Sequence, residues 1–250
     1  MDILALGWGV IAFAAAAFVA GGLVKGVLGI GLPLVVIPLL ATVLDVPSAV
    51  ALMPVPVLAS NIQQMFQGKG VVWSIRRFAS LILPMLVATV IAAQFMAEVD
   101  FRTGSLVLGA IVILFCLIQA FPLRTQLPAR SERWAHPVAG VITGFLGGLS
   151  NLFGPPLTMY LVALRLDREE FIAATATIFT IGSTTLYITM AINGLLTLPS
   201  LGVSAMATLP VMAGVALGSR LRGRLPDMMF RRALLLALGA IGLNLILGAI

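Results

Sequence analysis

The sequence predicts an all-α polytopic membrane protein made of two inverted repeats, each with a broken helical hairpin and three transmembrane helices. Three observations predict this fold class. The chain of 250 residues is 60% hydrophobic and 10% charged, whereas soluble domains carry roughly 25% charged residues. Two glycine-rich stretches occupy corresponding places in the two halves, and lysine and arginine gather in a few segments between apolar runs.

Eight apolar runs divide the chain. Six of them have close to the roughly 20 residues that a membrane helix needs: 48–66, 78–97, 103–121, 171–192, 199–219 and 233–250. Glycine and proline interrupt the other two, 8–40 and 137–163. Because these residues weaken a helix interior, and because a bilayer tolerates breaks only beside protein or a water-filled cavity, both runs are predicted to be broken helices. A matched pair of interrupted segments points to the substrate site of a transporter.

The two halves carry the same landmarks in the same order, which predicts an internal duplication with repeats at 1–121 and 122–250. Glycines spaced four and then three apart open both broken runs: Gly22, Gly26 and Gly29, then Gly140, Gly144 and Gly147. Twelve positions separate a proline from an aspartate after each break: Pro33 from Asp45, and Pro155 from Asp167. The tetrapeptide LGAI occurs at 108–111 and at 238–241, with an arginine seven positions before the glycine of each: Arg102 and Arg232.

The basic residues predict the course of the chain through the membrane. They gather in four segments that are expected to be loops: 67–77, 122–136, 164–170 and 220–232. The positive-inside rule places all four in the cytoplasm, but eight simple crossings would leave the last one outside. The conflict disappears when each broken run enters and leaves on one side as a hairpin. The halves are then inverted, and both termini lie on the side of the membrane opposite to the cytoplasm. The alternative is that each broken run is one long, kinked crossing, with the rule violated once.

The residue inventory argues against catalysis and against a metal or cofactor site. All nine carboxylates fall at run ends or in loops, so no acid–base pair or carboxylate relay is expected within a run. The single histidine, His136, is expected in a loop before Pro137, which excludes a histidine relay or a histidine metal cluster. Cys116 is the one cysteine, so no intrachain disulfide forms. The formal charge of +6 is interpreted as membrane orientation rather than nucleic-acid binding.

The first break offers four candidate substrate-binding residues: Lys25, Gly29, Gly31 and Pro33. A short helix that begins after Gly31 would present an N-terminus, which favours anions, and Pro33 suits its first turn. Lys25 is the one basic residue deep in an apolar run. Either its charge attracts an anion to the break, or its side chain snorkels to the outer interface.

The second break and the helices after the breaks supply the other candidates. At the break these are Gly147, Ser150, Asn151, Gly154 and Pro155. Ser150 and Asn151 either donate to an oxyanion or only cap the break. Polar side chains on the following helices either line the same cavity or form interhelical hydrogen bonds: Asn61, Gln64, Thr180 and Ser183. Asp45 and Asp167 are expected to be helix N-caps.

With glycines at these spacings, a second break that closes in Gly154-Pro155, and the pattern duplicated over the chain, the sequence resembles the sulfite exporter TauE/SafE family of bacterial membrane transporters. The resemblance covers almost the whole chain and rests on these residues: Gly22, Gly26, Gly29, Gly31, Pro38, Gly140, Gly144, Gly147, Gly154 and Pro155. It implies export of small sulfur oxyanions or organosulfonates, such as sulfite or sulfoacetate, across the cytoplasmic membrane.

Two rival functions stay open. One is uptake of another small anion, coupled to an ion that backbone carbonyls bind. The other is a non-transporting membrane subunit or a membrane-embedded enzyme, although an enzyme should show an acid–base pair within a run. An inside-negative potential drives anions outward by ~2.3 kcal/mol per charge at 100 mV, so export needs no coupling ion. The expected partners are the anionic substrate and the lipid bilayer, with a homodimer left open.

Overall fold

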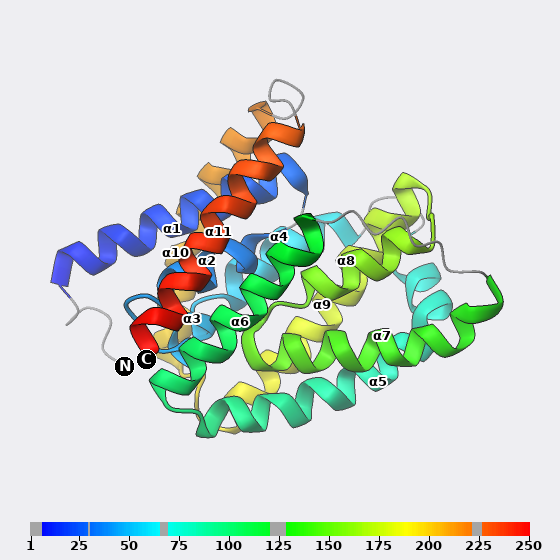
Figure 1. Cartoon of the computed structure of the whole chain (residues 1–250), viewed down its shortest axis with the longest axis horizontal. Coiled ribbons are helices and arrows are strands. Elements are labelled where there is room, and N and C mark those ends of the chain that lie inside the picture. The colour runs from blue at the N-terminus through cyan, green and yellow to red at the C-terminus, as the bar shows by residue number, and fades with distance from the viewer. Residues whose placement is uncertain (1–6, 30, 66–69, 121–128, 222–226) are drawn as a thin grey trace. The chain divides into compact units, whose positions relative to one another are not determined.

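Figure 1 shows the computed structural model of the chain, which describes residues 7–29, 31–65, 70–120, 129–221 and 227–250. Over these ranges its regular structure is helical, which confirms the all-α prediction. The helices are α1 (Gly7–Leu28), α2 (Leu32–Leu40), α3 (Val46–Ala51), α4 (Pro54–Met65), α5 (Gly70–Glu98), α6 (Phe101–Ala120), α7 (Ala129–Ser150), α8 (Gly154–Ala163), α9 (Arg168–Ile192), α10 (Leu198–Leu221) and α11 (Asp227–Ala249).

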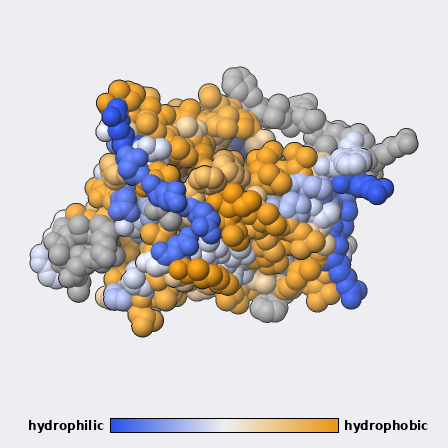
Figure 2. Space-filling model, turned by 90° about the horizontal axis from the view of Figure 1, so that it is seen from below, coloured by the Kyte–Doolittle hydropathy of each residue, from blue (hydrophilic) through white to orange (hydrophobic). Residues whose placement is uncertain are grey.

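The surface of these helices is apolar enough to face lipid. Six helices in the described ranges are long and apolar enough to cross a membrane: α1, α5, α6, α9, α10 and α11. Large apolar side chains are exposed along them, among them Leu83 at 64%, Leu209 at 76% and Leu236 at 75%. Figure 2 shows apolar residues over much of the visible face. Because a surface of this kind is unfavourable in water, the chain is a multi-pass membrane protein.

Contacts between helices divide the chain into two compact units. Unit 1 comprises Met1–Pro56, Val99–Pro122 and Thr197–Ile250, and unit 2 comprises Val57–Glu98 and Leu123–Leu196. Unit 1 therefore holds α1, α2, α3, α6, α10 and α11, whereas unit 2 holds most of α4 together with α5, α7, α8 and α9. Each unit takes helices from both halves of the sequence, so a compact unit does not coincide with a predicted repeat.

Both broken runs form hairpins of two helices, as predicted. In unit 1, α2 folds back along α1, so that a Cβ atom added to Gly21 would collide with the Val36 side chain. In unit 2, the centroid of the His136 ring on α7 lies 5.7 Å from the centroid of the Tyr160 ring on α8. A continuous helix, which rises 1.5 Å per residue, would hold these two pairs roughly 22 Å and 36 Å apart.

Within unit 1, α6 and α11 run antiparallel. The Arg102 guanidinium in the first turn of α6 donates to the carbonyls of Ala249 and Ile250 at the end of α11. Arg231 in the first turns of α11 donates to the Gln119 carbonyl and side-chain oxygen at the end of α6, at 3.2 and 3.1 Å. The LGAI repeat makes these helices equivalent in the two halves, so the halves are inverted. Two kinked crossings would instead make them parallel, which excludes that alternative.

Of the repeated glycines in the first run, Gly29 lies at the break, directly after α1, whereas Gly22 and Gly26 lie inside the helix and let a neighbouring helix approach. A Cβ atom on Gly22 would collide with the Val211 carbonyl of α10, and one on Gly26 with the Val215 carbonyl. Because residue numbers rise together on the two helices, α1 and α10 are parallel. Small residues permit such close packing between membrane helices, and the backbone they expose is covered by the partner.

The same packing recurs in unit 2, where α5 and α7 lie side by side (Figure 1). Cβ atoms on Gly140 and Gly144 of α7 would collide with the carbonyls of Leu81 and Met85. These two residues precede their unit 1 counterparts by 130 positions, which is also the interval between the LGAI motifs. The breaks themselves come later in each run, between α1 and α2 and between α7 and α8.

The run 48–66 was predicted to be one ordinary membrane span, but the structure forms two helices there. α3 ends at Ala51 and α4 begins at Pro54. Proline has no N–H and disfavours the helical conformation in the residue before it, which interrupts the backbone hydrogen bonds here. The fully buried Ser204 hydroxyl of α10 replaces two of them, because it donates to the Leu52 carbonyl at 2.9 Å and accepts from the Val55 N–H at 3.1 Å.

Several basic residues predicted in loops lie in helices. Arg76 and Arg77 belong to α5, which is kinked at Phe78. Others fall in the first or last turns of further helices: Arg130 and Arg133 in α7, Arg168 in α9, Arg220 in α10, and Arg231 and Arg232 in α11. The predicted helices were ended at the first basic residue beyond each apolar run. A helix can continue past that residue into the polar interface, because its backbone hydrogen bonds join residues only four positions apart. The predictions for Lys69, Arg124, Arg222 and Arg224 lie outside the described residues.

The two predicted N-caps are confirmed. The Asp45 carboxylate accepts the Ser48 N–H at 2.7 Å at the start of α3. The Asp167 carboxylate accepts the Glu170 N–H at 2.7 Å at the start of α9, and the Glu170 side chain bonds back to the Asp167 N–H. This reciprocal pair satisfies two N–H groups that a helix leaves free.

Candidate functional site

The first break is made by glycine backbone. Gly29 has φ 82° and Gly31 has φ 106°, a left-handed region that side chains disfavour. Gly31 is the N-cap of α2 and provides no side chain to cap it, and Pro33 lies in its first turn as predicted. The turn therefore depends on two residues without side chains.

Lys25 lies in the last turn of α1, directly before this break. Its carbonyl accepts the Gly29 N–H at 2.7 Å. Its side chain is only 6% exposed, so it is enclosed by protein and does not reach the surface as the snorkelling alternative requires. A charge buried in this way is costly unless it is paired or hydrated, which makes Lys25 a candidate for a functional role.

Side chains hold the second break. α7 ends at Ser150, and Asn151 follows with φ 57°, a left-handed conformation that asparagine tolerates better than most residues. The Nδ2 group of Asn151 donates to the Tyr187 hydroxyl at 2.8 Å, and the Ser183 hydroxyl donates to Oδ1 at 3.4 Å. All three side chains are buried, with Asn151 and Ser183 at 0% exposure. The amide is therefore fixed in position by two groups of α9.

The ring of Phe153 anchors the start of α8. A Cβ atom on Gly147 of α7 or on Gly182 of α9 would collide with this ring, so the phenyl group lies between two glycines. Phe179 packs edge-on against it, with centroids 5.8 Å apart. Gly147 was predicted to be a substrate-binding residue, and in the structure its lack of a side chain makes room for Phe153.

Prolines leave few free donors at the start of α8. Pro155 and Pro156 have no N–H, and the Leu157 N–H bonds to the Phe153 carbonyl at 3.3 Å. Within the described residues, Gly154 is then the one residue of this first turn whose N–H is left for a ligand. The helix end keeps its partial positive charge. Such a site suits a small anion that needs few hydrogen bonds.

The hydroxyl groups of Ser150, at the break, and of Thr177 and Thr180, on α9, differ in their availability. Ser150 donates to the Leu146 carbonyl at 2.8 Å, and Thr180 donates to the Ala176 carbonyl at 2.7 Å, so both are occupied within their own helices. Thr177, which is 0% exposed, has no hydrogen-bond partner for its hydroxyl among the described residues. An unpaired buried hydroxyl costs about 1–3 kcal/mol, so Thr177 is a better candidate donor than Thr180.

The structure brings together part of the predicted set. Unit 2 places Gly147, Asn151 and Ser183 around one cluster, with Ser150 and Gly154 on either side of the turn. Asn61 is buried at 4% on α4, and the side chain of Gln64 lies outside the described residues. The first-break residues Lys25, Gly29, Gly31 and Pro33 belong to unit 1.

Sequence reasoning missed Tyr187 and misplaced His136. Tyr187 is four residues after Ser183 and seven after Thr180, so helical spacing alone places it on their face. His136 lies inside α7 rather than in a loop and is 4% exposed. His136 was assigned to a loop because the apolar run begins only at Pro137, and a proline at that position suggested a helix boundary.

The comparisons with known proteins agree with this architecture. The model of the family described as Sulfite exporter TauE/SafE matches residues 13–245 of the 250. No curated protein and no solved structure matches the chain significantly. The match begins within α1, ends within α11, and includes both broken hairpins. The chain therefore belongs to the sulfite exporter TauE/SafE family.

Proposed function

We propose that this membrane transporter exports small sulfur-containing anions, such as sulfite, sulfoacetate or related organosulfonates, from the bacterial cytoplasm, and that the second helix break binds them. Asn151 carries the proposal. It lies fully buried at the positive end of α8, and its amide has two N–H groups, one of which donates to Tyr187. The other N–H is available to an oxyanion.

The chemistry around the break supports an anion rather than a cation. The break itself provides the amide of Asn151 and the N–H of Gly154, and α9 adds the buried hydroxyl of Thr177, which has no partner in the described structure. None of the carboxylates within the described ranges is buried. Lys25 provides a buried positive charge beside the equivalent break in unit 1. The family is one of transporters, and this arrangement has the donors that transport of an oxyanion needs without an acid–base pair.

The direction of transport follows from electrostatics in this proposal. An inside-negative membrane potential moves an anion outward with ~2.3 kcal/mol per charge at 100 mV. Flux from liposomes loaded with sulfite, sulfoacetate or chloride, with a potential imposed by a potassium gradient, tests this directly. We expect efflux of the sulfur anions that accelerates with inside-negative potential. Transport that instead requires a sodium or proton gradient would favour the rival, ion-coupled uptake.

The proposed topology places both termini in the periplasm. Single cysteines in a Cys116→Ala background report it, because a membrane-impermeant thiol reagent reaches one side of intact cells. A cysteine at Asp167, before α9, should react only after the cells are opened, and a cysteine at Asp100, between α5 and α6, should react in intact cells. The opposite pattern would reverse the proposed orientation and with it the direction of export.

A further inference from the structure

Buried hydroxyl, imidazole and amide atoms without partners are confined to unit 2. Six such side-chain atoms occur among the described residues: His136 Nε2, Thr143 Oγ1, Tyr160 Oη, Thr175 Oγ1, Thr177 Oγ1 and Asn193 Nδ2. All six belong to unit 2, and the described part of unit 1 has none. A buried polar atom without a partner destabilises the fold, and such atoms are nearly always paired with protein or water. The interior of unit 2 therefore has the donors and acceptors of a hydrated space.

Three polar residues follow one face of α7. His136, Thr143 and Ser150 are spaced seven apart, which is close to two turns, so they share a face. They are 4%, 0% and 1% exposed. Ser150 stands at the break. From there to His136 is about 21 Å along the helix axis, which exceeds the roughly 15 Å half-thickness of the hydrocarbon core. This polar face of α7 is long enough to reach from the break to the membrane surface.

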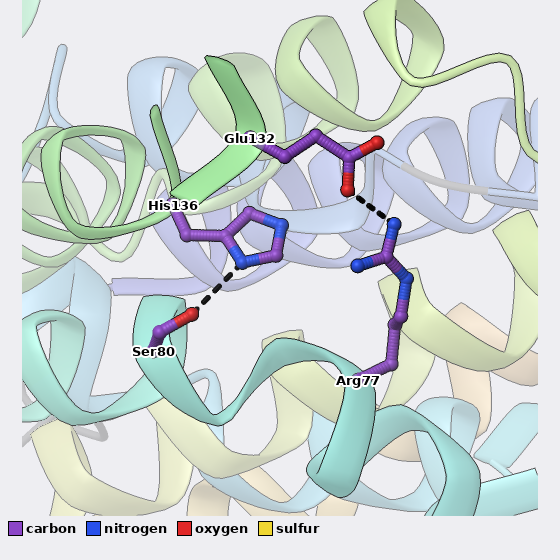
Figure 3. A network of polar contacts seen from close by, with 4 residues as sticks. All are labelled: Arg77, Ser80, Glu132 and His136. Carbon is purple, nitrogen blue, oxygen red and sulfur yellow. Dashed lines mark hydrogen bonds and ion pairs between the residues drawn. The ribbon is translucent and has the colours of Figure 1, made fainter. Parts of the chain in front are cut away.

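Several residues mark the His136 end of this face as the surface end. Trp134 is 78% exposed, as is usual for tryptophan at a membrane interface. Arg77 and Glu132 form an ion pair near His136. Figure 3 shows the His136 ring bonded to Ser80 on one side, with the Arg77–Glu132 pair beyond the other. Exposed charges of this kind are stable at the interface and costly at mid-membrane.

The groups at this end are suited to bind an anion. The Ser80 hydroxyl lies 2.8 Å from Nδ1 of His136. When Ser80 donates this hydrogen bond, the neutral imidazole carries its proton on Nε2 and can donate it. The Tyr160 hydroxyl on the adjacent ring is a second buried donor without a partner in the described structure. Glu132, a carboxylate at this end of the face, is paired with Arg77.

We propose that the polar face of α7, from His136 and Tyr160 through Thr143 to Ser150, is a hydrated path by which small oxyanions move between the membrane surface and the second break. The proposal rests on the proposed function. Thr143 has the position that Lys25 has in α1, because each directly precedes the second of the repeated glycines. The duplicated hairpins thus carry a buried polar side chain at the same place, and in α7 it is a donor that a passing anion can use.

Reactivity of a cysteine at Thr143 tests whether the path is hydrated. The reagent is 2-sulfonatoethyl methanethiosulfonate, which is itself a small sulfonate anion, and the background is Cys116→Ala. The matched control is Thr89→Cys, because Thr89 is equally buried at 0% but its hydroxyl is bonded to the carbonyls of Met85 and Gly144 at 2.8 and 3.2 Å. We expect Thr143→Cys to react at least about tenfold faster, because the control reacts only when the helices separate.

The possible outcomes distinguish the proposed path from the proposed transport of sulfur anions. Sulfoacetate should slow the labelling of Thr143→Cys if it uses the path. Fast labelling without protection or transport of any sulfur anion would leave the path standing and remove the proposed function. Labelling as slow as that of Thr89→Cys, in protein that still transports sulfoacetate, would overturn the path.

Tyr160→Phe provides a second test that does not depend on a tolerated cysteine. It removes only the unpaired oxygen, so the melting temperature should stay the same or rise. If Tyr160 binds the anion, the apparent affinity for sulfoacetate should fall at least about tenfold, because a hydrogen bond to a charged group is stronger than one between neutral groups. Unchanged affinity together with a raised melting temperature would show that the hydroxyl is only an unpaired core group. Thr189→Val, which removes a buried hydroxyl already bonded to Thr185 within α9 at 2.9 Å, should not affect transport.

Discussion

The two helix breaks occupy equivalent places in the two halves of the chain, but they are built differently. Backbone conformation shapes the first break, and side-chain contacts fix the second. At the first break, Gly29 and Gly31 turn the chain with positive φ angles of 82° and 106° and contribute no side chains. At the second, Asn151 is bonded to two side chains of α9 and Phe153 is wedged between two glycines. A backbone turn without side chains can change conformation at little cost, whereas a turn locked by packing cannot. From this comparison we predict hinge-like behaviour at the first break, and the proposed function places substrate recognition at the second.

The largest expected effect is at the glycine that receives the Phe153 ring. Gly147→Leu places a side chain where the ring lies, and overpacking of this kind costs typically 1–3 kcal/mol or more. We expect a lower melting temperature and complete loss of transport. Gly9→Leu, at an open position of α1 with nothing near it, is the control and should leave both unchanged. A stable, active Gly147→Leu protein would show that the second break is not locked by packing.

Lys25 tests whether the first break contributes charge. Two charges 4 Å apart interact with ~4 kcal/mol at an effective dielectric of 20. Lys25→Met should therefore weaken transport of a doubly charged anion more than that of a singly charged sulfonate, measured at one voltage. Lys25→Arg keeps the charge with a different geometry, so it should retain part of the activity. Equal affinities in the parent and in Lys25→Met would assign this lysine to structure.

Asn151→Gly separates the backbone role of this residue from its amide. Glycine keeps the left-handed conformation without strain, so the fold should persist. The loss of one donor to a charged ligand should weaken apparent anion affinity about tenfold. Tyr187→Phe, which removes the hydroxyl that accepts from Asn151, should cause a smaller loss because the amide itself remains. If Asn151→Gly transports like the parent, Asn151 only caps the break.

The smallest expected effect is at the first break. Gly31→Ala forces a residue with a Cβ atom into a positive φ angle, which costs about 1–2 kcal/mol, although the space around it is only slightly restricted. We expect a modest drop in melting temperature and a change in maximal flux with little change in affinity. A change in affinity with unchanged maximal flux would contradict the hinge-like behaviour assigned to this break.

Much of the fold could be predicted because its signals are local or periodic. The apolar content and run lengths predicted a helical membrane protein, and the positions of Pro33, Asp45, Pro155 and Asp167 predicted where helices begin. The charge pattern predicted the hairpins and the inversion. Basic loops must lie on the same side of the membrane, and this requirement fixes how many times the chain crosses between them. The antiparallel pair of α6 and α11 confirms the inversion. Pro54 and Pro56 were visible too, but their effect on 48–66 was missed.

The candidate site was harder to predict because contacts between distant helices create it. Asn151 was recognisable as a polar residue in a break, but its partner Tyr187 lies 36 positions away. His136 was set aside as a loop residue, although its ring packs between α5 and α8 within unit 2. The hydroxyl groups of Ser150 and Thr180 bond within their own helices, whereas those of Thr143 and Thr177 have no partner in the described structure. No local sequence pattern distinguishes these two cases.

The sequence by itself determined the helices, the duplication and the places of the two breaks, because propensity, capping and hydrophobic periodicity act over a few residues. Only the tertiary structure decided what the repeated glycines do. Their spacing is the same whether they weaken a helix or admit a neighbour, and the outcome depends on the helix that packs against them. The packing of α10 against α1 and of α5 against α7 made Gly22, Gly26, Gly140 and Gly144 contact surfaces. Gly29, Gly31 and Asn151 instead turn the chain at the breaks with positive φ angles.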